Sequence, residues 1–248
     1  MLSLMISVFL SSCLMSGDGN TRIIENGGAG SFKAVAVSSD DCPGMTVYVP
    51  QDFAAVVEKT TLPVVVFEGA GGSKYEKYLN EIASFGYIVA DIGTADPDAA
   101  MESLMASGAF RGAFADVSSV AVVSTIGSAS VLPSCDVRTI IYLHSSQPAA
   151  GVPVLYIAGG LDVPVYTRVQ QDFELSDGHF AAVATYPAGK EGTFDEAFGG
   201  SYSMLTLQWL EWLLKDKPWS RTVFTGEECI CVYTGWGIQY KNEETVID

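Results

Sequence analysis

The stretch Pro63-Val64-Val65-Val66-Phe67-Glu68-Gly69-Ala70-Gly71-Gly72 decides the fold class of this chain. Its first half is an unbroken run of apolar and mostly β-branched residues, which is the pattern of a strand buried on both faces. Its second half supplies glycines for a tight turn, and Tyr75, Leu79 and Ile82 then recur at helical spacing. A buried strand, a glycine turn and an amphipathic helix in this order predict a unit of a parallel α/β sheet.

The same alternation continues to residue 215. We expect further strands at 45–49, 87–92, 119–124, 138–143, 153–158 and 180–186, and helices at 75–85, 96–107, 165–173 and 201–215. Solid apolar strands between amphipathic helices predict an α/β fold, with a mostly parallel sheet and helices on both faces. In such sheets the ligand crevice lies beyond the carboxyl ends of the strands.

The chain is long enough for one large domain, which we place at residues 42–242. Residues 17–41 are rich in Gly, Ser, Asn and Asp and predict an irregular segment, and residues 243–248 predict a tail. Residues 1–16 form an apolar run too short to span a bilayer, which is typical of a secretory signal. Leu10–Cys13 also resembles a lipoprotein signal, in which Cys13 would carry a lipid anchor, so both interpretations predict a secreted or cell-envelope protein with no transmembrane segment.

Charge and cysteine content narrow the classes of partner. Thirteen basic residues against 29 acidic ones give a net charge of −16, and such a surface repels nucleic acid. Apart from Cys13, four cysteines remain (Cys42, Cys135, Cys229 and Cys231), and an exported chain could join them as two disulfides in any of three connectivities. Metal binding is the weaker alternative because the chain has only His144 and His179 and no Cys-x-x-Cys pair, so we expect no metal and no cofactor.

A family resemblance rests on several phrases in a fixed order. The opening stretch, with Tyr78-Leu79 and Ala83–Ala90 after it, resembles the start of secreted cutinase-like and polyester-hydrolase-like enzymes, a branch of the α/β-hydrolase superfamily related to dienelactone hydrolases. Three further phrases match the same family: Met45–Pro50 with Asp52, Pro153–Pro164, and Trp209–Trp236. The resemblance covers Cys42–Asn242 and implies an α/β-hydrolase fold built around an ester-hydrolase site.

The nucleophile motif implied by this resemblance is degenerate. The family places a serine in Gly-x-Ser-x-Gly on a sharp strand-to-helix turn, and the corresponding stretch here is Val123-Ser124-Thr125-Ile126-Gly127. Thr125 therefore stands at the nucleophile position, and Val123 replaces the first glycine. A β-branched residue tolerates poorly the strained dihedrals of such a turn, and Val123 removes the glycine that lets the turn close.

The resemblance finds a carboxylate at the acid position of the triad but no histidine at the base position. Asp162 stands at the end of an apolar strand, where the family has its triad carboxylate, although a helix N-cap beside Pro164 explains it equally well. At the position of the family's histidine the chain has Gly192, with Glu191 beside it. Without an imidazole, the hydroxyl of Thr125 has no base of near-neutral pKa to take its proton.

Other groups could complete a site. His144 follows the strand at 138–143, so we expect it in the crevice as a surrogate base or as a turn residue. His179 precedes its strand, so we expect it at the far end of the sheet in a structural role. The resemblance implies oxyanion donors at the backbone amides of Gly71, Ala70 and Ile126.

Three functions remain open at this stage. The chain is a catalytically impaired hydrolase relative that binds a small ester, lipid or polyester chain, or an active esterase using Thr125 with His144 or Glu191 as base. The third alternative is a non-catalytic structural or interaction protein.

Overall fold

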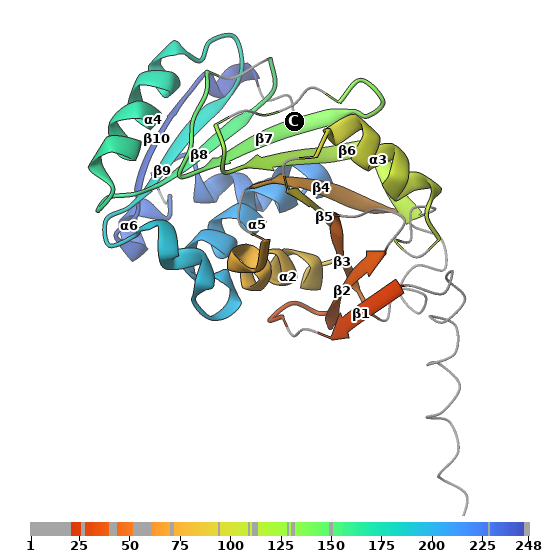
Figure 1. The fold of residues 1–248 in the computed structure, drawn as a ribbon. Helices are drawn as coiled ribbons and strands as arrows, with labels where there is room; N and C mark the ends of the chain where they lie inside the picture. The colour runs from red at the N-terminus through yellow and green to blue at the C-terminus, as the bar shows by residue number, and fades with distance from the viewer. Residues whose placement is uncertain are drawn as a thin grey trace, which may run out of the picture.

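The computed structural model describes residues 21–25, 28–39, 44–51, 61–69, 72–93, 95–108, 110, 114–127, 129, 132–148, 151–227 and 229–245. Within them one mixed sheet has the strand order β1-β2-β3-β5-β4-β6-β7-β8-β9-β10 (Figure 1). The strands are β1 (Thr21–Glu25), β2 (Ala34–Ser39), β3 (Thr46–Pro50), β4 (Leu62–Glu68), β5 (Ile88–Gly93), β6 (Ala115–Ser124), β7 (Val137–Leu143), β8 (Val154–Gly159), β9 (Ala181–Tyr186) and β10 (Gly237–Lys241). The helices are α2 (Glu76–Ser84), α3 (Pro97–Ala106), α4 (Val163–Leu175), α5 (Gly200–Lys215) and α6 (Cys231–Thr234), with 3-10 turns η1 (Gly72–Tyr75), η3 (Glu191–Asp195), η4 (Ala197–Gly199), η5 (Pro218–Val223) and η6 (Glu243–Thr245).

The centre of the sheet is parallel. Strands β5, β4, β6, β7, β8 and β9 run in one direction, whereas β1, β2 and β3 pair antiparallel on one side and β10 pairs antiparallel with β9 on the other. The prediction of an α/β fold with a mostly parallel sheet is confirmed. Helix α3 also begins as expected, because the carboxylate of Asp96 accepts a hydrogen bond from the Ala99 amide at 2.9 Å.

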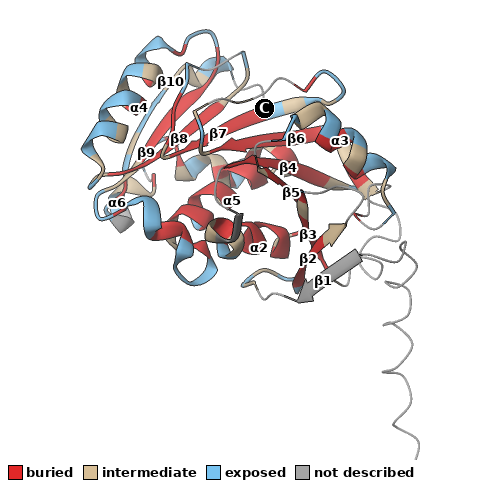
Figure 2. Ribbon diagram, viewed as in Figure 1, coloured by how far each residue is buried: buried red, intermediate tan, exposed pale blue. Residues whose placement is uncertain are grey.

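Both faces of the sheet are covered. Along β4, Val65 and Phe67 join the core under α2 and α5, and Val64 and Val66 join the core under α3 and α4. This alternation follows from the two-residue period of a strand, which sends successive side chains to opposite faces. Figure 2 shows the central strands buried, while much of α4 faces solvent.

The prediction of an irregular segment at residues 17–41 is wrong for residues 21–25 and 34–39, which form strands. Ala34–Ser39 forms β2, which pairs with β3, and Thr21–Glu25 forms β1 beside it. Residues 34–37 alternate alanine and valine, and their signal was outweighed by the surrounding Gly and Ser residues. The expectations for residues 1–16, including the lipid anchor at Cys13, lie outside the described residues, and η6 occupies the start of the predicted tail.

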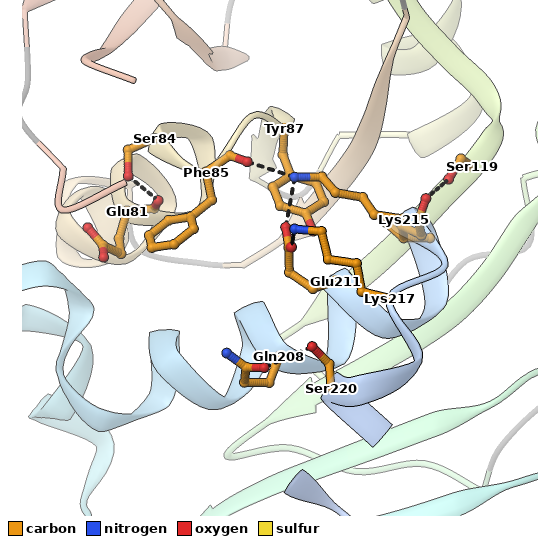
Figure 3. Close-up of polar contacts among 11 residues, drawn as sticks. Glu81, Ser84, Phe85, Tyr87, Ser119, Gln208, Glu211, Lys215, Lys217 and Ser220 are labelled. Atoms are coloured by element: carbon orange, nitrogen blue, oxygen red, sulfur yellow. Dashed lines mark hydrogen bonds and ion pairs between the residues drawn. The ribbon is translucent and has the colours of Figure 1, made fainter. Parts of the chain in front are cut away.

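A buried ion cluster fixes the end of α5 against the turn that leads into β5 (Figure 3). The ammonium of Lys215 donates to the Phe85 carbonyl at 2.7 Å and to the Glu211 carboxylate at 2.8 Å. That carboxylate also accepts from Tyr87 and forms an ion pair with Lys217. The ammonium also lies 3.9 Å from the centre of the Tyr87 ring, and only 20% of the side chain is exposed, so burial lowers the pKa of Lys215 to about 8.

The helices that the structure describes are all too short or too polar to cross a bilayer, as expected from the sequence.

Candidate active site

The residues expected in the site follow the carboxyl ends of neighbouring parallel strands. Glu68 ends β4, Thr125 follows β6, His144 follows β7 and Asp162 lies beyond β8. Because these ends share one edge of the sheet, the topology brings their side chains to the same crevice.

Thr125 is held against the end of β4. Its amide donates to the Glu68 carbonyl at 2.9 Å, and its hydroxyl donates to the same oxygen at 3.4 Å. A Cβ atom placed on Gly69 would lie 2.9 Å from the Thr125 hydroxyl oxygen, so the glycine is required for this close approach. Thr125 does not have a positive φ. The left-handed residue of this turn is Gly127, with φ of 73°.

The turn after β6 also differs from the one that the resemblance implies. Among the described residues between Ser124 and Val137 there is no helix. The Ile126 amide, an expected oxyanion donor, instead donates to the Ser124 hydroxyl at 3.3 Å. The two other expected donors, the amides of Ala70 and Gly71, lie outside the described residues.

His144 and Asp162 form the clearest pair in the crevice. Nδ1 of His144 lies 3.9 Å from Oδ2 of Asp162, an ion-pair distance longer than a hydrogen bond. Asp162 occupies the N-cap position of α4, but its side chain accepts no capping hydrogen bond. The Asp162 side chain thus makes no capping contact, and Nδ1 of His144 is a buried nitrogen without a hydrogen-bond partner among the described residues.

The other nitrogen of His144 is engaged by a tyrosine. Nε2 lies 2.7 Å from the hydroxyl of Tyr202, which is fully buried in α5. The imidazole is 6% exposed and packs edge-on against Phe194. Burial lowers the pKa of His144, and the carboxylates of Asp162 and Glu191 oppose this shift only in part, so the imidazole is neutral at pH 7.

The backbone of His144 is strained. His144 has φ of 49°, a left-handed conformation that costs a non-glycine residue roughly 1–2 kcal/mol. The turn is held in place because the His144 amide donates to the Ile157 carbonyl at 2.9 Å and the Ser145 hydroxyl to the Ser124 carbonyl at 2.7 Å. Such strain is concentrated at functional sites.

The structure thus brings His144 to Asp162, and no hydrogen bond or ion pair among the described residues links Thr125 to either of them. Within the described residues the hydrogen bonds of Thr125 go to Glu68, and those of the His144 ring go to Tyr202. An imidazole with a carboxylate behind it is present, and the hydroxyl it contacts belongs to Tyr202 instead of Thr125. Whether His144 acts on Thr125 stays a prediction.

Glu191 is a poor substitute for the missing base. It starts η3 after β9, and its carboxylate forms an ion pair with Lys74 of η1. The hydrogen bond from the Lys74 ammonium holds the pKa of Glu191 below its usual range, which weakens it as a proton acceptor. A second ion pair, between Lys77 of α2 and Asp195 at 3.0 Å, joins α2 to η3.

Gly192 has room for a larger side chain. It is exposed, and a Cβ atom there would meet only the Lys190 Cε at 4.0 Å. A larger side chain at this position would therefore meet no steric obstacle among the described residues.

Exposed aliphatic side chains stand on the two loops that flank His144. Ile126 is 46% exposed after β6, and Leu161 and Val163 are 67% and 63% exposed after β8. We call these three residues the apolar rim. Neither the rim nor Tyr202 was identified from the sequence, because Leu161 and Val163 lie in the Asp162 turn and Tyr202 had no signal that separated it from the core residues of its helix.

His179 and the cysteines lie elsewhere. His179 is buried just before the amino end of β9, where its carbonyl accepts from Asn242 at 2.9 Å, so the expected position far from the crevice is confirmed. The sulfurs of Cys229 and Cys231 lie within bonding distance, and Cys135 forms no disulfide among the described residues. Cys42 lies outside them.

Neither protein-family models nor the sequences of curated proteins give a match to this chain.

Proposed function

We propose that this chain has the α/β-hydrolase fold, is exported, and is a catalytically impaired relative of carboxylic ester hydrolases that binds an ester, lipid or polyester chain without cleaving it. Support for the fold comes from chain order: the nucleophile, acid and histidine positions (Thr125, Asp162 and Gly192) follow β6, β8 and β9, and this fold uses the order nucleophile, acid, histidine. Support for export comes from the apolar run at residues 1–16.

The main observation in support of impaired catalysis is that His144 contacts Tyr202. Its Nε2 atom is 2.7 Å from the Tyr202 hydroxyl, while the Thr125 hydroxyl faces the Glu68 carbonyl. A hydroxyl becomes a useful nucleophile only when a neighbouring base accepts its proton, and a backbone carbonyl cannot do so. The Ile126 amide is also engaged by Ser124, which removes a donor for the developing oxyanion.

The apolar rim supports ligand binding. Ile126, Leu161 and Val163 expose aliphatic surface at the edge where parallel sheets bind their ligands. Covering one such side chain completely stabilises a complex by about 1.5–3 kcal/mol, so the acyl or polymer chain of an ester has a partner here and a hydrophilic ligand does not.

The test separates turnover from binding. We expect p-nitrophenyl butyrate to be hydrolysed no faster by the wild-type protein than by Thr125→Ala, and no labelling of Thr125 by a fluorophosphonate. The same ester should bind the wild-type protein in calorimetry, with affinity at least ten-fold lower for Ile126→Ser/Leu161→Ser. The matched control is Leu175→Ser, which removes an equally exposed leucine (68%) at the far end of α4 and should leave binding unchanged.

One observation favours the active-esterase alternative. His144 is neutral and has a carboxylate 3.9 Å behind it, as a general base requires. Hydrolysis that disappears in both Thr125→Ala and His144→Gln would establish this alternative and contradict our proposal. Absence of both binding and turnover would leave the structural role.

A further inference from the structure

A cavity lies at the edge of the sheet opposite the edge that holds His144 and Asp162. It has a volume of about 740 Å³, within the range of small-molecule sites. Val137 opens β7 and Pro153 precedes β8, so the cavity borders the amino ends of these strands. Since β7 runs from Val137 to Leu143, the cavity is separated from the His144 crevice by the length of a strand, about 20 Å.

The wall of this cavity is largely apolar. Its apolar residues come from β7, the approach to β8, the end of α5 and η5: Val137, Val152, Pro153, Trp212, Leu213 and Pro218. Trp212 is only 7% exposed and packs against Phe180 and Trp209, so this wall is part of the rigid core. A preformed apolar wall favours a ligand with an apolar body.

The charged groups of the cavity are one cation and two anions, and Thr245 adds a neutral hydroxyl. Nε of Arg138 donates to the Ser118 carbonyl at 3.0 Å, which fixes the guanidinium in place. Asp136 and Asp216 lie 4.0 Å and 3.9 Å from its nitrogens, beyond hydrogen-bond distance. Their side chains are 67% and 88% exposed, so both carboxylates keep free acceptor oxygens.

The balance of charge selects the ligand. Two carboxylates against one guanidinium give this wall a net charge of −1, and the whole chain carries −16. An anion that approached Arg138 would meet Asp136 and Asp216 on either side and the field of the whole molecule beyond them. A cation would be attracted by both carboxylates and by that field.

We propose that this cavity is a second ligand site, for an amphiphile with a single ammonium group and a short apolar chain. The ammonium donates to the carboxylates of Asp136 and Asp216, and the chain lies on Trp212 and Leu213. The site is independent of the proposed function of the crevice.

The first experiment compares three eight-carbon probes by calorimetry at low salt: octylammonium, octanoate and 1-octanol. We expect octylammonium to bind at least ten-fold more tightly than either of the other two. Equal or tighter binding of octanoate or 1-octanol, or no binding of any probe, would overturn the proposal.

Variants locate the site. Asp136→Asn/Asp216→Asn should weaken octylammonium binding at least ten-fold, while Arg138→Gln should strengthen it several-fold, a gain that misfolding cannot produce. The control Glu102→Gln/Asp177→Asn removes the same charge at exposed positions and should leave the affinity within two-fold. If both double variants lost the same affinity for octylammonium, only the overall charge of the protein would matter. If Ile126→Ser/Leu161→Ser lost affinity, octylammonium would bind at the apolar rim. Either result contradicts the proposal.

Discussion

Tyr202 determines what His144 is able to do. Nε2 of His144 forms a hydrogen bond of 2.7 Å with the Tyr202 hydroxyl, which also donates to the Lys190 carbonyl at 3.3 Å, so this nitrogen is engaged whichever tautomer the ring adopts. In an ester hydrolase the corresponding nitrogen faces the nucleophile. Here Tyr202 occupies that nitrogen, and the Thr125 hydroxyl bonds to the Glu68 carbonyl instead.

Tyr202→Phe tests this interpretation. Removing the hydroxyl leaves a buried nitrogen without a partner, so we expect the free energy of unfolding in urea to fall by about 1–3 kcal/mol. We expect no gain in ester hydrolysis, because Thr125 remains bonded to Glu68. Hydrolysis that appears in Tyr202→Phe and disappears in Tyr202→Phe/Thr125→Ala would show that the tyrosine alone blocks catalysis.

Restoring two triad residues should also fail. Thr125→Ser/Gly192→His supplies a serine and an imidazole, and the open surroundings of Gly192 allow the protein to fold. Within the described residues Thr125 has no positive φ and no helix follows the turn, unlike a nucleophile elbow, and Val123 is fully buried in the sheet. We expect initial rates with p-nitrophenyl butyrate within ten-fold of wild type, whereas a complete triad is worth about 10⁴-fold or more. A rate more than a thousand-fold above wild type would show that the turn supports catalysis and that Val123 does not prevent it.

At the scale of elements, the buried strands were predictable and the edges were not. Solid apolar runs such as those of β4, β7 and β8 locate a strand to within one or two residues, because burial on both faces leaves no polar position. By contrast, β10 has five residues and is partly exposed along its length, and its alternation rests on Ile238 and Tyr240 alone, which is too short a pattern to predict a strand. The contact of His144 with Tyr202 joins residues 58 apart in the sequence, and no local pattern encodes it.

The same limit applies to the candidate site. The sequence predicts which residues reach the carboxyl edge, because strand ends follow from strand positions. It does not predict which neighbour each side chain contacts: from the sequence Asp162 could cap α4 or face an imidazole, and the structure shows no capping hydrogen bond and a distance of 3.9 Å to His144.

The ion cluster of α5 predicts a pH dependence of stability. Burial lowers the pKa of Lys215 from 10.5 to about 8, so between these values the unfolded chain holds a proton that the folded chain has released. Stability then rises with pH across this interval, and below about pH 8 the cost of the buried charge is present in full. We expect the free energy of unfolding of wild type, minus that of Lys215→Met, to increase from pH 8 to 10.5. The exposed Lys33→Met provides the control, and a flat or falling difference would contradict the assignment.

Across the whole molecule the net charge of −16 sets the response to salt. Like charges on a compact surface repel one another, and salt screens them over about 10 Å at 0.1 M. We expect the melting temperature at pH 7 to rise as NaCl increases from 10 to 300 mM. The rise should vanish near pH 4.3, the isoelectric point, and a rise of equal size there would rule out charge repulsion as the cause.

The antiparallel strand β10 has a protective consequence. Next to it, β9 offers the small, buried and uncharged sequence Ala181-Ala182-Val183-Ala184, and β10 occupies the hydrogen-bonding groups on that side. Without β10, this edge of the sheet would be a template on which another chain could add a strand, the first step toward fibrous aggregates. Lys241, at the end of β10, places a charge on the outermost strand, where it discourages such growth. The last described strand thus keeps neighbouring molecules from joining through their sheets.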